Sequence, residues 1–256
     1  MVLAKKSYGQ HFLKNQGTAT EIARLFHQYN TTKLALEVGP GMGALTSELL
    51  AHYPNLKAVE ADHDMVQYLA ENIPEVQVYP ADFMKFDVKS AYPTEEFGLV
   101  GNFPYNISSQ IIFKMLDNME QIPIMVGMFQ REMADRVIAP PGSKTYGVIS
   151  ALSQGYYKAK IIMKLKPGSF VPPPKVDSAV ILMERIPSKI PNEDKALYFK
   201  VVKQSFGQRR KMLRNTLKDL LPANVLENDY FKKRPEELGV EEFLQIVDTI
   251  KENQQT

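Results

Sequence analysis

Short apolar runs alternate with amphipathic segments over the first 140 residues of the chain. The apolar runs, which have the length of buried strands, are 34–38, 56–61, 76–79, 97–101 and 122–129. The segments between them with apolar residues at helical spacing are 18–29, the segment after Gly43, 64–72, 108–119 and 131–138. Strands that alternate with helices in this way predict an α/β fold with a parallel, doubly wound sheet.

The pattern changes in the later part of the chain. Residues 156–165 and 178–186 alternate like strands, but a proline run at 172–174 separates them instead of a helix. We therefore expect an antiparallel pair at one edge of the sheet. Residues 187–194 are typical of a linker, and no strand pattern follows them, whereas 195–221 and 235–252 have helical patterns. These observations predict one domain over 1–186 and a small all-helical domain over 187–256.

Composition excludes several classes of protein. Of the 256 residues, 44% are hydrophobic and 23% are charged, as in ordinary globular proteins. Cysteine is absent, which excludes disulfides, thiolate metal sites and cysteine nucleophiles. The four histidines have no metal-ligand spacing, so we expect no metal site. No apolar run has the length of a membrane span, and the apolar part of the first six residues is too short for a signal peptide. We therefore expect a cytoplasmic protein.

Charge is segregated along the chain although the net charge is only +2. Lys5, Lys6 and Lys14 precede the first acidic residue, Glu21. Residues 195–218 contain eight Lys or Arg and no Asp or Glu. Such segregation is typical of a surface that binds a polyanion, and the alternative is a solvated helix face.

Glycines and acids follow three successive predicted strands. Gly39 and Gly41 lie in the first strand-to-helix turn, where glycine lets the backbone approach a ligand closely. Glu60 ends the next strand, where a carboxylate can accept both hydroxyls of a ribose. Asp82 follows the third strand and can accept from an exocyclic amine of a base. Together they predict a nucleoside site.

Two cofactors compete for this site. Gly39, Gly41 and Ala44 satisfy the dinucleotide fingerprint, and Glu60 follows about 20 residues later, so a nicotinamide-dependent dehydrogenase is one alternative. However, Glu37 precedes the turn, where its carboxylate would repel a pyrophosphate but attract a cation. The acid-plus-glycine turn therefore favours S-adenosylmethionine, a sulfonium with an amino-acid tail.

The stretch from Gly101 to Asn106 follows the fourth predicted strand and has the groups needed to activate an adenine amine. The lone pair of that amine is delocalised into the ring, and two acceptors for its N–H groups would favour a pyramidal nitrogen. The Asn102 side chain can be one acceptor, and the carbonyl of Phe103 or Pro104 the other. Tyr105 can stack on the base, and Phe170 is a candidate for the opposite face. The alternative is an ordinary strand-to-helix turn.

Five motifs together resemble the KsgA (RsmA) family of small-subunit ribosomal RNA adenine dimethyltransferases. They are GQHFL at 9–13, EVGPG at 37–41, NFPYN at 102–106, QRE at 130–132 and FVPPPKVDS at 170–178. The resemblance implies a Rossmann-like methyltransferase domain followed by a small helical domain. It also implies transfer of methyl groups from S-adenosylmethionine to N6 of two adjacent adenosines, in a hairpin near the 3′ end of small-subunit RNA.

The resemblance also implies roles for individual residues. The implied catalytic residues are Asn102, Pro104, Tyr105 and Phe170. The implied cofactor-binding residues are Gln10, His11, Leu13, Glu37, Gly39, Gly41, Glu60, Asp82, Phe83 and Asn102. The implied RNA-binding residues are Lys5, Lys6, Arg209, Arg210, Lys211 and Arg214, and 1–17 would be a segment that contacts cofactor and RNA. Two positions depart from the family: many members have Asn at position 11, and Leu is usual at position 103.

Other functions stay open on the sequence. An Erm-type enzyme, which methylates adenine in large-subunit RNA, shares the Asn-x-Pro-Tyr core. A non-catalytic RNA-binding assembly factor on a methyltransferase scaffold is a third hypothesis, although intact Glu60, Asp82 and Asn102 argue against it. We expect the partner to be the immature small ribosomal subunit and the protein to be a monomer.

Overall fold

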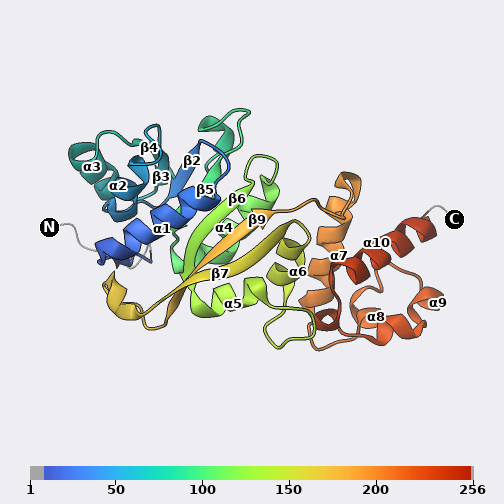
Figure 1. Ribbon diagram of the computed structural model, residues 1–256. Helices are drawn as coiled ribbons and strands as arrows, with labels where there is room; N and C mark the ends of the chain where they lie inside the picture. The colour runs from blue at the N-terminus through green and yellow to red at the C-terminus, as the bar shows by residue number, and fades with distance from the viewer. Residues whose placement is uncertain (1–8, 255–256) are drawn as a thin grey trace. The chain divides into compact units, whose positions relative to one another are not determined.

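A seven-stranded sheet forms the centre of the α/β part of the protein (Figure 1). The structure is a computed structural model that describes residues 9–254. In spatial order the strands are β4 (Gln77–Pro80), β3 (Lys57–Glu60), β2 (Ala35–Val38), β5 (Gly98–Asn102), β6 (Ile124–Gln130), β9 (Ser178–Arg185) and β7 (Tyr157–Leu165). The five strands from β4 to β6 pair in parallel, and β9 runs antiparallel to β6. Every predicted strand is present within two residues of its predicted limits.

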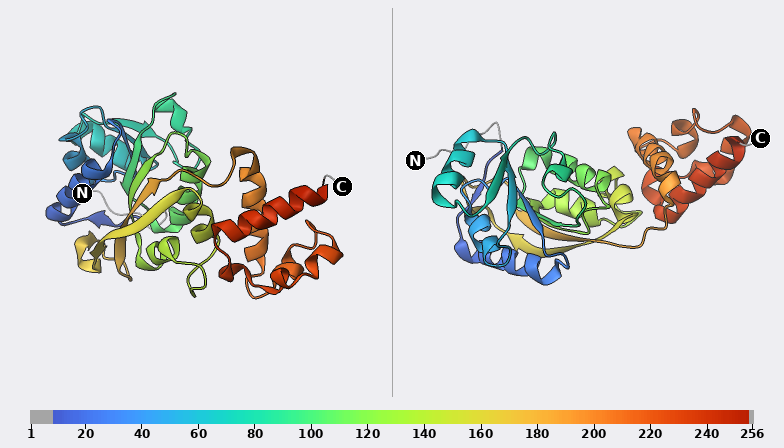
Figure 2. Two further views of the ribbon diagram at one scale, coloured as in Figure 1. Left: turned by 45° about the vertical axis from the view of Figure 1, so that its right-hand side comes forward. Right: turned by 90° about the horizontal axis from the view of Figure 1, so that it is seen from above.

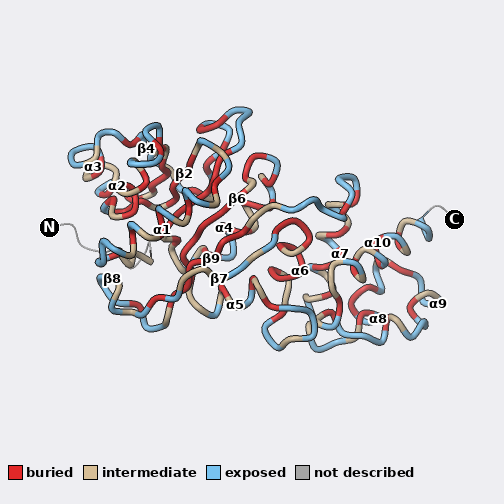
Figure 3. Tube along the Cα trace, viewed as in Figure 1, coloured by how far each residue is buried: buried red, intermediate tan, exposed pale blue. Residues whose placement is uncertain are grey.

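The order of the strands indicates where a ligand would bind. The chain winds outward from β2 through β3 to β4, and then returns to the other side of β2 with β5. In doubly wound folds, ligands bind beside the carboxyl ends of the strands at this reversal. The sheet is mixed because β7 and β9 follow each other without a crossover helix, as the proline run predicts. Strands β6 and β9 are buried along most of their length (Figure 3).

Helices cover both faces of the sheet. The first unit contains α1 (Gln16–Tyr29), α2 (Ala44–Leu50), α3 (His63–Asn72), α4 (Ser108–Asp117) and the start of α5 (Arg131–Ile138). Figure 2 shows α1 and α2 on one face and α4 on the other. Asn15 and Asp62 are the N-cap residues of α1 and α3, and each side chain accepts a hydrogen bond from a backbone N–H of the first turn.

A second, two-stranded sheet was not predicted. Strand β1 (Phe12–Leu13) pairs antiparallel with β8 (Phe170–Val171), so that Leu13 lies opposite Phe170. The Lys14 N–H also donates to the Ser169 carbonyl at 2.9 Å. This pairing ties the N-terminal segment to the segment before the proline run.

The chain forms two compact units. The first runs to Ala134 and resumes over Ala159–Arg185; the second comprises Asp135–Lys158 and the chain from Ile186 onward. The predicted domains, 1–186 and 187–256, differ from these units in the placement of Asp135–Lys158. The physical reason is α6 (Val148–Gln154), which packs with the later helices: the Tyr198 hydroxyl donates to the Ala151 carbonyl at 3.0 Å.

The later part of the second unit is entirely helical across its described residues. Its helices are α7 (Lys195–Gly207), α8 (Leu213–Thr216), α9 (Ala223–Leu226) and α10 (Val240–Gln254). Two predicted helices are shorter than expected. Residues 195–221 are interrupted after Gly207, since Gln208 leaves the helical conformation with φ −132° and ψ 66°. Residues 235–252 begin with an isolated 3₁₀ turn, Pro235–Glu237, before α10.

Candidate active site

A cavity of about 650 Å³ opens at the carboxyl ends of β2, β3 and β5. Segments far apart in the sequence line it: 9–13, the turn after β2, the end of β3, 81–83 and the stretch after β5. The lining includes all the predicted cofactor residues, namely Gln10, His11, Leu13, Glu37, Gly39, Gly41, Glu60, Asp82, Phe83 and Asn102. Pro104 and Tyr105 also line it. The structure therefore brings these predicted residues together.

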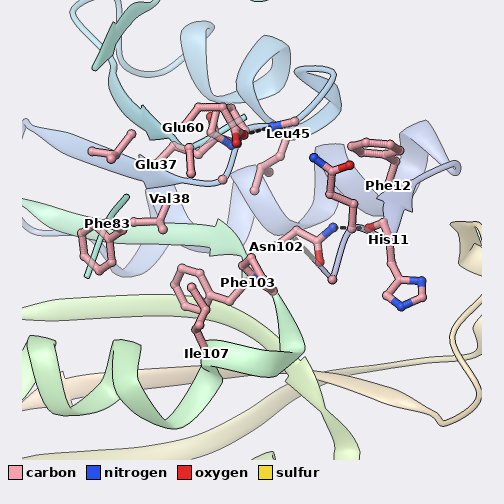
Figure 4. A pocket seen from close by; sticks show the side chains of 18 of the residues that line it. His11, Phe12, Glu37, Val38, Leu45, Glu60, Phe83, Asn102, Phe103 and Ile107 are labelled. Atoms are coloured by element: carbon pink, nitrogen blue, oxygen red, sulfur yellow. Dashed lines mark hydrogen bonds between the residues drawn. The ribbon is translucent and has the colours of Figure 1, made fainter. Parts of the chain in front are cut away.

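The turn after β2 depends on glycine. Gly39 and Gly41 have φ values of +69° and +56°, which L side chains rarely adopt. A Cβ on Gly41 would also lie 2.9 Å from the Phe12 ring. The Gly41 N–H donates to a Glu60 carboxylate oxygen at 3.0 Å, which ties the turn to the end of β3 (Figure 4).

Glu60 holds two backbone groups at once. Its other carboxylate oxygen accepts from the Asp62 N–H at 2.9 Å, and the side chain is only 6% exposed. Burial raises the pKa of Glu60 above its ordinary value, and the hydrogen bonds from Asp62 and Gly41 oppose this shift. Each carboxylate oxygen retains a second lone-pair direction, so Glu60 can still accept from a ligand.

Glu37 is buried without a full set of partners. It is 1% exposed, and its Oε2 has no hydrogen-bond partner among the described residues. Burial raises the pKa of Glu37 to about 8; the Thr46 hydroxyl opposes this shift, and the Glu60 carboxylate adds to it. A buried, unpaired carboxyl oxygen is costly unless a ligand satisfies it. Because Glu37 lines the cavity, this oxygen fits a cationic or hydrogen-bond-donating ligand.

We expect Glu37 to make the stability of the ligand-free protein depend on pH. The pKa of this carboxyl is higher in the folded state than its ordinary value of 4.5, so the folded state binds the extra proton. The contribution of Glu37 to the free energy of unfolding is therefore fully present below about pH 4.5 and is lost as pH rises towards about 8. The slope approaches about 1.4 kcal/mol per pH unit. Urea unfolding between pH 5.5 and 8 measures it.

The matched variant for this prediction is Glu37→Gln, which keeps the shape and removes the titrating group. Its free energy of unfolding should lack the part of the slope that Glu37 causes. Parallel pH profiles for the two proteins would contradict the raised pKa. A bound cation would lower that pKa again, so wild-type protein should release protons when it binds S-adenosylmethionine at pH 7, measured by calorimetry in two buffers.

Asn102 lies at the end of β5 with its amide held in one orientation. Its Nδ2 donates to the His11 carbonyl at 2.7 Å, across 91 positions of sequence (Figure 4). That bond leaves the Asn102 Oδ1 as an acceptor. The N-terminal segment therefore fixes which amide atom of Asn102 serves as the acceptor.

Tyr105 begins a 3₁₀ turn just after Asn102. Its ring stacks on the His11 ring with centroids 5.3 Å apart, and its hydroxyl lies 2.6 Å from the Ser178 hydroxyl. The His11 ring is itself held by the Pro172 carbonyl at 2.7 Å. One face of Tyr105 is thus covered by His11, and a base that stacks on that face must displace it.

Phe170 is not among the residues that line the cavity. It lies in β8 opposite Leu13, is 2% exposed and belongs to the hydrophobic core. The physical reason is the unforeseen β1–β8 pairing, which turns this ring into the interior. A stacking role for Phe170 requires its ring to leave the core and stays a prediction.

The part of the cavity away from the N-terminal segment is lined by apolar side chains and one acid, Asp82. Figure 4 shows Phe83, Val38 and Ile107 near one another, with Phe103 between Asn102 and Ile107. Asp82 is exposed, and its Oδ1 accepts from the Met84 N–H at 2.9 Å. Its other carboxylate oxygen accepts no hydrogen bond from residues 9–254, so Asp82 can accept from an exocyclic amine on a flat aromatic ligand.

Sequence reasoning missed several lining or supporting residues. Asp62 is 1% exposed and accepts from the Gln10 side chain at 3.0 Å, so it anchors the N-terminal segment to the start of α3. An acid two residues after Glu60 was the available signal. Phe12, Met42 and Ile107 line the cavity without any distinguishing pattern.

The predicted RNA-binding residues are divided between described and undescribed parts of the chain. Lys5 and Lys6 lie outside the described residues. Arg210, Lys211 and Arg214 are exposed near the start of α8, whereas Arg209 donates to the Lys144 carbonyl at 2.6 Å. Within 9–254 no three His, Asp or Glu residues are grouped to hold a metal ion. None of the described helices has both the length and the apolar content needed to cross a membrane.

Comparison with known proteins decides the family. The family model described as "Ribosomal RNA adenine dimethylase" matches residues 1–254. The chain belongs to this family. A Flavobacterium johnsoniae protein named "Ribosomal RNA small subunit methyltransferase A" is 44% identical over 253 residues, covering 97% of this chain and 96% of that protein. A Bacteroides thetaiotaomicron protein of the same name is 44% identical over 256 residues, covering 98% and 96%. This dimethylase is therefore a methyltransferase, and the dehydrogenase alternative is set aside.

Solved structures support the fold. A dimethyladenosine transferase from Plasmodium falciparum has a TM-score of 0.75 at 24% identity, covering 94% of this chain and 98% of that one. The 23S rRNA methyltransferase ErmE has a TM-score of 0.72, also at 24% identity, covering 94% and 99%. The Rossmann-like fold with a helical C-terminal part is thus confirmed for this dimethylase.

Proposed function

We propose that the protein transfers methyl groups from S-adenosylmethionine to N6 of two adjacent adenosines in a hairpin near the 3′ end of small-subunit ribosomal RNA. The observation that carries the proposal is the Asn102 amide, whose Nδ2 is held by the His11 carbonyl so that Oδ1 is an acceptor in the cavity. Family membership and the names of the 44% identical relatives support the RNA class.

Two acceptors can bind the N–H groups of the target adenine. One is the Asn102 Oδ1. The Pro104 carbonyl already accepts from the Ser108 hydroxyl and the Ile107 N–H, both at 3.2 Å. Both of its lone pairs are therefore used, which favours the Phe103 carbonyl as the second acceptor. Together these oxygens would aim the nitrogen lone pair, which is catalysis by position and electrostatics.

The cavity residues fit S-adenosylmethionine, which supplies an electrophilic methyl group when bound. Glu60 would accept the ribose hydroxyls, Asp82 the adenine amine, and Phe83 would pack against the adenine ring. The unpaired Oε2 of Glu37 would meet the cationic part of the ligand. Gly39 and Gly41 leave room for the methionine portion, since neither carries a side chain.

RNA contact is proposed for the exposed basic residues near the start of α8. Arg210, Lys211 and Arg214 have no acidic partner among the described residues. Such side chains contact phosphates without reading sequence, and their contribution falls with salt. The target base must leave its stack to enter the cavity and meet Tyr105. We also propose that the enzyme is a monomer that acts on immature small ribosomal subunits in the cytoplasm.

The test is methylation of ribosomal RNA in vitro. The protein is incubated with labelled S-adenosylmethionine and small subunits that lack dimethyladenosine, and in parallel with large-subunit RNA. We expect two adjacent dimethyladenosines in small-subunit RNA and no label in large-subunit RNA. Label confined to large-subunit RNA would indicate an Erm-type enzyme. Absence of label together with normal RNA binding would indicate a non-catalytic assembly factor.

A further inference from the structure

Two glycines lie side by side in neighbouring strands, Gly101 next to the last residue of β5 and Gly127 in the middle of β6. Gly101 and Gly127 are register partners in the parallel ladder. Glycine in the interior of a strand weakens it, because it adds no packing and loses more entropy on folding. Neither residue has a positive φ, so backbone conformation does not require glycine at either place. A close approach by another group is therefore the physical reason for both.

The Phe103 ring approaches both glycines. A Cβ on Gly127 would lie 2.2 Å from Cε2 of Phe103 and 2.8 Å from Cε2 of Phe129. A Cβ on Gly101 would lie 2.8 Å from Cε1 of Phe103, and it would also lie 2.5 Å from the Val38 carbonyl oxygen. The ring thus rests on both Cα atoms at once. Phe129 packs against it edge-to-face with centroids 5.1 Å apart, and Phe103 is 1% exposed. We call Gly101 and Gly127 the glycine seat.

We propose that the glycine seat makes Phe103 a positioning residue for methyl transfer, because the seated ring fixes the backbone between the two proposed adenine acceptors. This inference rests on the proposed function. The Phe103 backbone joins Asn102, which supplies the side-chain acceptor, to Pro104, and its own carbonyl is the second acceptor. A ring held on three sides allows that carbonyl little movement.

The seat also matches the side chain at position 103. The flat ring needs the space left by two missing Cβ atoms, whereas a leucine is shorter and would leave part of that space empty. The phenylalanine and the glycines therefore form a complementary set. Displacing the ring should shift the acceptors, and a shift of about 1 Å in a reacting group can cost about 10²-fold in rate.

The test is a double-mutant cycle between positions 127 and 103 in the full-length protein. Gly127→Ala should lower kcat for adenine methylation about 10²-fold, while the Kd for S-adenosylhomocysteine changes less than about threefold. Phe103→Leu alone should lower kcat about tenfold. The double variant should recover part of the loss of Gly127→Ala, because leucine removes the closer of the two ring contacts of the new methyl group and leaves the one with Phe129 at 2.8 Å. Gly168→Ala is the matched control, since a Cβ there meets nothing within 4 Å.

Thermal unfolding of the same four proteins separates this inference from the proposed function. The seat predicts that the Tm loss of Gly127→Ala is partly reversed in the double variant, whether or not any RNA is methylated. Equal and additive effects on kcat and Tm would overturn the inference and leave the function standing. Non-additive Tm values with no methylation by wild-type protein would instead overturn the function. If Gly127→Ala does not fold, recovery of folding in the double variant still supports the seat.

Discussion

Replacing Asn102 by alanine is expected to lower kcat for adenine methylation about 10²–10³-fold, with the cofactor Kd raised less than about tenfold. The variant loses the Oδ1 acceptor that would bind one N–H of the target amine. Loss of one preorganised hydrogen-bonding group in an enzyme site typically costs this much. Cofactor binding should survive in part, because Glu37, Glu60 and Asp82 are unchanged. Single-turnover methylation and calorimetry measure the two quantities.

Asn102→Asp gives a sharper test of how the amide is held. Aspartate keeps an acceptor oxygen but loses the N–H that donates to the His11 carbonyl at 2.7 Å. The carboxylate and that carbonyl would then repel each other, so this variant should be nearly as impaired as the alanine variant. Asn72→Ala, on the exposed face of α3, is the control. Wild-type turnover in Asn102→Ala would contradict the proposed role, and wild-type turnover in Asn102→Asp would contradict the orientation.

The sheet could be predicted from the sequence because its signals are local. Each strand is an apolar run bounded by turn residues, and the acids at the strand ends needed only the topology to converge. Glu60 and Asp82 line one cavity for that reason. By contrast, β1 and β8 have two residues each, too few for a period, and their pairing spans about 160 positions. The burial of Phe170 follows from that pairing.

Contacts between residues far apart in the sequence also orient the side chains of the site, and these contacts could not be predicted from the sequence. The hydrogen bond from Asn102 to the His11 carbonyl fixes the orientation of the amide, yet no sequence pattern near either residue predicts that the two meet. The glycine seat is similar: Gly101 and Gly127 become partners only through the register of β5 and β6. In the second unit, α6 packs with the later helices through Tyr198, although about 40 residues separate the two in the sequence and no local pattern predicts the contact. Local pattern thus placed the residues, and tertiary packing set their orientation.

Replacing Glu60 by alanine is expected to weaken cofactor binding and the ligand-free fold together. Glu60 would offer a ribose two charge-assisted hydrogen bonds of about 1.5–3 kcal/mol each, so the Kd for S-adenosylhomocysteine should rise at least about 10²-fold. The same change leaves the buried N–H groups of Gly41 and Asp62 without their acceptor. Each such loss costs about 1–3 kcal/mol. Calorimetry and urea unfolding at one pH measure both effects.

Glu60→Gln separates the two roles. Its amide keeps one acceptor oxygen but directs an NH₂ group at the Gly41 or Asp62 N–H, so one of the two backbone bonds is lost. Stability and affinity should both lie between those of wild type and Glu60→Ala. Glu71→Gln, an exposed carboxyl on α3, should change neither. If Glu60→Ala unfolded at a lower urea concentration but bound S-adenosylhomocysteine normally, Glu60 would only stabilise the glycine turn. That result would contradict its proposed role in binding the ribose hydroxyls.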